Sequence, residues 1–95
     1  MQLMILFARH PDKETVSPGE LGQAEFEKVR GLYMDGFVRQ IWLRVDQPGA
    51  CMIVEASSID QAADKVAALP LVRAGFLQVP TIIPLQPYAG FAPGH

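Results

Sequence analysis

The chain has 95 residues, of which 49% are apolar and 19% charged, and its net charge is −2. A length of this order suits one domain, and the eight basic residues are scattered rather than grouped into a phosphate-binding patch, which excludes nucleic acid as the expected partner. The single cysteine, Cys51, leaves no internal disulfide, and no apolar stretch approaches the roughly 20 residues of a membrane span. We therefore expect a cytoplasmic protein that binds neither nucleic acid nor a membrane.

The first two elements are predicted from an apolar run and an amphipathic pattern. Every residue from Leu3 to Ala8 is apolar, which predicts a strand that is buried on both faces. After a polar connection, the sequence predicts a helix that is capped by Ser17 and runs to about Asp35. An apolar stripe on this helix should pack against the sheet, and the charged residues between should be solvated. The stripe consists of Phe26, Val29 and Tyr33, and the solvated residues include Glu25, Glu27 and Arg30.

The segment from Phe37 to Val45 alternates in character and predicts a second strand. Pro48-Gly49 then suits a type II turn, so the segment from Ala50 to Glu55 should return as a third strand paired with the second. Strict alternation places the two sets of second-strand side chains on opposite faces. One set is Phe37, Arg39, Ile41 and Leu43, which should meet the helices, and the other is Val38, Gln40, Trp42 and Arg44. The second set combines a large aromatic with polar groups, as a ligand cavity would.

The remainder of the chain predicts one more helix and one more strand. The helix should begin with Ser57 as its cap and end near Leu69, where a proline follows. The segment from Val79 to Leu85 reads as a strand, and its two prolines indicate a position at the sheet edge or at a bulge. We place the domain at residues 1–88 and a Pro/Gly-rich C-terminal arm at residues 89–95.

The predicted order of elements is β-α-β-β-α-β, which is the ferredoxin-like α+β pattern. It implies a four-stranded antiparallel sheet with two helices on one face. Because the first and third strands are apolar on both faces, a second copy of the chain should cover the face that the helices leave open. We therefore expect a homodimer or higher homo-oligomer of the dimeric α+β barrel type, with a cavity for a small molecule between the two sheets.

Three residues are candidates for proton transfer. His10 follows the first strand, and histidine is the side chain that exchanges protons most readily at neutral pH, although a solvated loop position explains it equally well. Asp35 and Tyr33, near the end of the first helix, are a candidate acid and a candidate donor, with core packing as the other interpretation of Tyr33. The two histidines and the one cysteine have no metal-ligand spacing, so we expect neither a metal nor a cofactor.

The second strand supplies the candidate substrate-binding residues. Arg39 and Arg44 are able to hold a carboxylate in a bidentate fork, and each is also typical of surface ion pairs. Trp42 offers a flat surface for a ring, or else packs in the core or an interface. Gln40 is a polar neighbour on the Trp42 face.

These residues resemble those of muconolactone isomerase. The resemblance rests on Gly36, on Arg39 and Trp42 at the following family positions, and on a later helix that ends in Leu69-Pro70-Leu71. Arg44 sits one residue later than its counterpart, and Gln40 stands where the family has a histidine. The resemblance implies the ferredoxin-like fold, assembly into rings of dimers, and a proton shift within an unsaturated lactone without metal or cofactor.

A second resemblance, to YCII-related domains, covers residues 71–76 and 84–88, and Asp35 lies close to that family's aspartate position. It implies the same fold and assembly but a different chemistry. The leading functional hypothesis is a muconolactone isomerase-like enzyme acting on a small carboxylated lactone or enol. The alternatives are a non-catalytic small-molecule-binding or assembly module, and a cofactor-free oxygenase.

Overall fold

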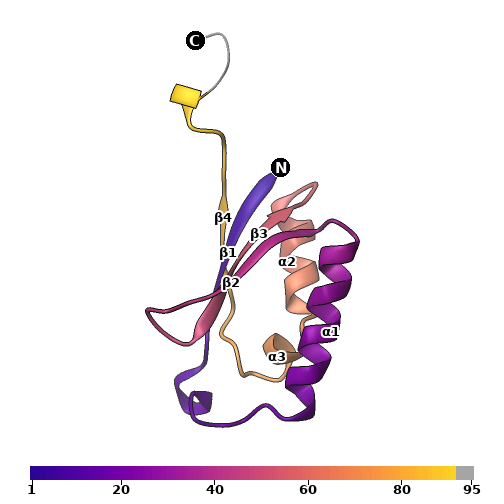
Figure 1. Cartoon of the computed structure of the whole chain (residues 1–95), viewed down its shortest axis with the longest axis vertical. Helices are drawn as coiled ribbons and strands as arrows, with labels where there is room; N and C mark the ends of the chain where they lie inside the picture. The colour runs from indigo at the N-terminus through magenta and orange to yellow at the C-terminus, as the bar shows by residue number, and fades with distance from the viewer. Residues whose placement is uncertain (92–95) are drawn as a thin grey trace.

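The computed structural model describes residues 1–91 and consists of a four-stranded antiparallel sheet with helices on one face (Figure 1). The strand order β2-β3-β1-β4 confirms the predicted ferredoxin-like α+β fold. No helix in these residues is long and apolar enough to cross a membrane. The elements are β1 (Gln2–Ala8), η1 (Pro11–Lys13), α1 (Glu20–Met34), β2 (Val38–Leu43), β3 (Gly49–Glu55), α2 (Ile59–Ala67), α3 (Pro70–Arg73), β4 (Thr81–Pro84) and η2 (Ala89–Phe91).

The two faces of β1 have different environments. Leu3, Ile5 and Phe7 lie in the core, where they pack with side chains of α1 and α2, and each is at most 1% exposed. Met4 and Leu6 point to the other side of the sheet and are only partly buried in a single chain. The helices therefore cover one face, as predicted, and the open face is apolar along its central strands. The expected homo-oligomer stays a prediction.

A β-bulge in β2 changes the faces that strict alternation predicts. Val38 pairs with Val54, but the next paired residue, Gln40, lies opposite Ile53, so Arg39 is an extra residue on β2. Val38 consequently faces the helices and is 1% exposed. Its predicted position on the same face as Trp42 is wrong, because the inserted residue reverses the alternation at this point.

Both helix starts differ from the predicted caps. Helix α1 begins at Glu20 after Gly19, which has no side chain to cap it, and the Ser17 hydroxyl accepts a bond only from the Gly19 amide at 3.4 Å. Helix α2 is capped by Ser58, one residue later than predicted, and the Ser58 hydroxyl accepts a bond from the Gln61 amide at 3.0 Å. Two adjacent serines compete for this role, and the extended backbone of Ser58 decides it.

Strand β4 lies at the edge of the sheet and pairs only with β1, as its prolines predict. Beyond β4 the chain leaves the body of the domain and ends its described part in η2 (Figure 1). Residues 92–95 of the predicted C-terminal arm lie outside the described residues. The division between domain and arm at residue 88 stays a prediction.

Candidate active site

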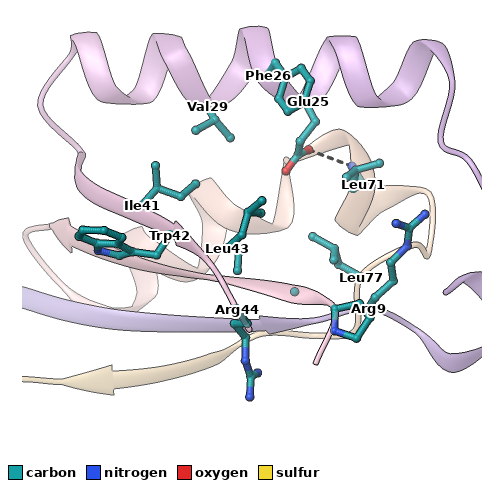
Figure 2. A pocket seen from close by; sticks show the side chains of 13 residues that line it. Arg9, Glu25, Phe26, Val29, Ile41, Trp42, Leu43, Arg44, Leu71 and Leu77 are labelled. Atoms are coloured by element: carbon teal, nitrogen blue, oxygen red, sulfur yellow. Dashed lines mark hydrogen bonds between the residues drawn. The ribbon is translucent and has the colours of Figure 1, made fainter. Parts of the chain in front are cut away.

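A cleft of about 560 Å³ lies between α1 and the sheet (Figure 2). Its volume is within the range of small-molecule pockets, and its lining is mainly apolar. Val29 descends from α1, Ile41 and Leu43 rise toward it from β2, and Leu77 closes one end. The cleft is on the helix side of the sheet, whereas we expected the ligand cavity on the opposite face, between two copies of the chain.

The cleft lies where α1 does not pack closely against the sheet. Leu32, near its C-terminal end, is buried at 6% exposure, but Phe26 and Tyr33 are 66% and 58% exposed. Leu43 on the facing strand is 85% exposed. The predicted core stripe of Phe26 and Tyr33 is therefore wrong. The sequence pattern shows an apolar helix face but not how far the helix stands from the sheet.

Glu25 is the acidic side chain of the cleft. It projects from α1 into the space above the sheet, and its Oε1 accepts a hydrogen bond from the backbone amide of Leu71 in α3 at 3.1 Å (Figure 2). Burial raises the pKa of the Glu25 carboxyl above its ordinary value, and the bond from Leu71 partly opposes that shift. Glu25 is half-buried, so the prediction of a solvated residue is wrong. The packing of α3 on α1 is a tertiary feature without a local sequence signal.

Arg9 lies at the end of the cleft near Leu77, and sequence reasoning did not single it out. Its backbone amide donates to the carbonyl of Pro48 at 2.9 Å, which fixes the chain just after β1. The guanidinium donates to the Val16 carbonyl. Within residues 1–91 no ion pair joins Arg9 to Glu25, so the two opposite charges face the same space without neutralising each other.

Trp42 and Arg44 are the predicted binding residues that the structure brings to this cleft, where they lie at its rim. Trp42 is 62% exposed and pairs with Cys51. The Arg44 guanidinium points away from α1 (Figure 2) and forms a two-bond ion pair with Asp46, Nε to Oδ1 at 3.0 Å and Nη2 to Oδ2 at 2.6 Å. Hydrogen bonding to Arg44 lowers the pKa of the Asp46 carboxyl. The charge of Arg44 is therefore already matched.

Three other predicted residues lie at or near the C-terminal end of α1 and do not line the cleft. Asp35 is the C-cap of α1, and its Oδ1 accepts a bond from the Phe37 amide at 3.0 Å. Arg39 donates from Nε to the carbonyl of Gly36 at 2.8 Å. Tyr33 is exposed on the surface of α1. Their proposed roles in chemistry or binding stay predictions.

His10 and Gln40 also lie outside the residues that line the cleft. The His10 Nδ1 accepts a bond from the Asp12 amide at 3.3 Å and caps η1, and its side chain is 48% exposed. Gln40 is exposed and lies opposite Ile53 in the register, on the face that the helices leave open. His10 and Gln40 are thus absent from the lining of the cleft, whereas Trp42 is part of it.

No protein-family profile matches this sequence, and no curated protein matches it. Several solved structures match, and two of them are similar over most of the chain. The 5-chloro-2-hydroxyhydroquinone dehydrochlorinase (TftG) from Burkholderia phenoliruptrix AC1100, solved with 2,5-dihydroxybenzoquinone, is 18% identical with a TM-score of 0.75, covering 90% of this chain and 94% of that one. Muconolactone isomerase is 17% identical with a TM-score of 0.75, covering 94% of this chain and 92% of that one.

This chain has their fold. The likeness to muconolactone isomerase, which the sequence suggested through Gly36, Arg39 and Trp42, is confirmed for the architecture. Sequence identity at this level carries the fold and not the reaction, so the chemistry has to be argued from the cleft itself.

Proposed function

We propose that this protein is a cofactor-free isomerase that moves a proton within a small unsaturated, carboxylated lactone or enol bound in the cleft. The observation that carries this proposal is Glu25, a carboxylate held in a mainly apolar cleft where burial raises its pKa. A general base works best when its pKa approaches the pH at which it operates, and burial moves Glu25 in that direction.

The reaction needs only one carboxylate. The ionised Glu25 removes a proton from the carbon at the far end of the conjugated system, and the electron pair moves into the ring to form a dienolate. The same side chain, now protonated, returns the proton to the carbon next to the ring carbonyl. The double bond changes position, and neither an oxidant nor a leaving group is involved. The half-buried position of Glu25 on a rigid helix suits such a transfer.

The similar structures support the choice of substrate class. One is named as the isomerase of muconolactone, and the other was solved with a dihydroxybenzoquinone. A small oxygenated ring is also what a cleft of about 560 Å³ accommodates. Ile41 and Leu43, which project from β2 toward α1, would form a wall for that ring. Because neither His10 nor Asp35 lines the cleft, both are weaker candidates for the base than Glu25.

The test is proton exchange into muconolactone in D₂O, followed by NMR. The wild type should catalyse the exchange, and Glu25→Gln should lower the rate by roughly a hundredfold or more while keeping its circular dichroism spectrum, since a positioned general base contributes about 10²–10⁴. Glu27→Gln is the matched control, because Glu27 is exposed on the same helix. Full activity of Glu25→Gln combined with an inactive His10→Gln would instead make His10 the base.

The alternative is a non-catalytic small-molecule-binding or assembly module. One observation favours it: the bond from the Leu71 amide to Glu25 ties α3 to α1, which is a structural role in its own right. The two functions differ in a single experiment. If the protein is a binding module, it should bind small ring compounds in the cleft, and the wild type should transfer no deuterium into any lactone or enol acid.

A further inference from the structure

Two cations meet on one aromatic ring, and one of them, Arg9, lines the end of the cleft, whereas Lys13 and the ring of Phe76 lie behind that lining. The Cζ of Arg9 lies 5.4 Å from the centroid of the Phe76 ring, and the Nζ of Lys13 lies 5.4 Å from the same centroid. The ring is 9% exposed, so this is a largely dry position. Attraction to the ring face offsets part of the repulsion between the two positive charges but does not neutralise them.

Neither cation has a carboxylate partner within residues 1–91. The one bond from the Arg9 side chain goes to the neutral carbonyl of Val16, and its buried Nε has no acceptor in this part of the chain. An unsatisfied buried donor destabilises the fold, and more strongly when it belongs to a charged group. The contrast is Arg44, whose guanidinium donates two hydrogen bonds to the Asp46 carboxylate and one to the Phe7 carbonyl.

The backbone holds this cluster in place. Arg9 forms an antiparallel bridge with Leu77, and the amide of His10 donates to the carbonyl of Phe76 at 2.8 Å. The end of β1, the start of η1 and the segment after α3 are thereby joined beside the cleft. A preorganised pair of uncompensated cations is the arrangement that binds an anion with little loss of side-chain freedom.

We infer that Arg9 and Lys13, gathered on the Phe76 ring, form an anion-binding end of the cleft that holds the carboxylate of a small planar ligand. The ring of the ligand would lie between Val29 and Leu43, with its far side within reach of Glu25. This assignment rests on the proposed function for the identity of the ligand as a ring acid. It moves the carboxylate from Arg39 or Arg44, where the sequence suggested it, to Arg9.

The test compares benzoate with the uncharged benzyl alcohol, each titrated into the full chain and followed by isothermal titration calorimetry. Wild type should bind benzoate at least about tenfold more tightly than benzyl alcohol, because a charge-assisted bond is worth roughly 1.5–3 kcal/mol. Arg9→Gln should remove that preference, Arg9→Lys should keep part of it, and Lys13→Gln should reduce it about threefold. Arg30→Gln, an exposed arginine on α1, is the matched control and should bind benzoate as the wild type does.

The inference is overturned if the wild type binds the two probes equally or does not bind benzoate. Both of these measurements use the wild-type protein alone, so they do not require any variant to fold. Unchanged preference in a folded Arg9→Gln overturns it as well. The proposed function fails independently of this inference. If the protein binds benzoate through Arg9 but catalyses no proton exchange into lactones, the anion site stands and the isomerase activity does not. If Arg9→Gln still catalyses the exchange with the KM of the wild type, the isomerase activity stands and this anion site does not.

Discussion

Protonation of Glu25 is linked to the stability of the fold. Burial raises the pKa of this carboxyl in the folded chain above its ordinary value of 4.5, so the folded state binds the proton more tightly than the unfolded state does. The contribution of Glu25 to stability is therefore complete below its unfolded pKa and is lost as the pH rises through the folded value. At neutral pH the half-buried carboxylate is a cost to the fold.

The variant Glu25→Gln should show this cost directly. Its amide oxygen is still able to accept the bond from Leu71, but it has no charge to desolvate. Relative to that of the wild type, its free energy of unfolding should increase as the pH rises from 4 to 7, so that the variant becomes the more stable protein, as measured by urea denaturation at several pH values. Glu27→Gln, at an exposed position, should follow the wild-type pH profile. Parallel curves for all three proteins would contradict the burial of Glu25.

At the level of single residues the sequence predicted only part of the cleft lining. Trp42 and Arg44 were recognised from their strand and do lie at the cleft. Glu25 was missed because its environment depends on Leu71, which is 46 residues further along the chain. Arg9 was missed because the ring that it contacts, Phe76, follows α3. Contacts of this kind have no local pattern.

The start of β3 passes unusually close to β1. Gly49 pairs with Ala8, and a Cβ atom added to Gly49 would overlap the carbonyl oxygen of Phe7. Gly49→Ala should therefore destabilise the protein by roughly 1–3 kcal/mol, since backbone has to move. In α1, an added methyl group at the exposed Gly31 meets no atom within 4 Å, and Gly31→Ala should stabilise by roughly 0.5–1 kcal/mol. Thermal unfolding of the two variants measures both effects, and equal shifts would contradict the close approach of the strands.

The helix starts provide a second comparison between elements. Ser58 caps α2 with a bond to the Gln61 amide, whereas Ser17 lies outside α1 and caps none of its amides. Ser58→Ala should cost about 1 kcal/mol of unfolding free energy, and Ser17→Ala should stay within about 0.5 kcal/mol. Urea denaturation distinguishes them. A larger loss for Ser17→Ala would restore the cap that the sequence pattern suggested.

Elements were predicted better than their details. Apolar runs, alternation and helical periodicity predicted the four strands and the two longer helices of residues 1–91, because buried faces leave a pattern in the sequence. The bulge at Arg39 was not predicted, since an inserted residue has no signature within an alternating strand. The distance between α1 and the sheet was equally hidden, and the cleft depends on it.

The sheet face that the helices leave uncovered is the surface through which we expect the chain to associate. Ile53 lies opposite Met4 in the central pair of strands, on the side without helices, and we expect this face to associate with a second copy. Ile53→Asp should therefore dissociate the wild-type dimer or larger assembly, as measured by sedimentation velocity. Met34→Asp, which changes an exposed apolar residue of α1, is the control and should leave the assembly intact. A stably folded wild-type monomer at micromolar concentration would contradict the expectation.

The sheet also acts as a partition between two surfaces with separate requirements. The cleft residues Glu25 and Val29 lie on one side of it, and Ile53 lies on the other. Under the proposed function and the expected association, substitutions in the helix-facing wall should change ligand preference and preserve the contacts between copies. In protein engineering, libraries that vary Val29, Ile41 and Leu43 should alter ligand choice without a new quaternary structure to select for.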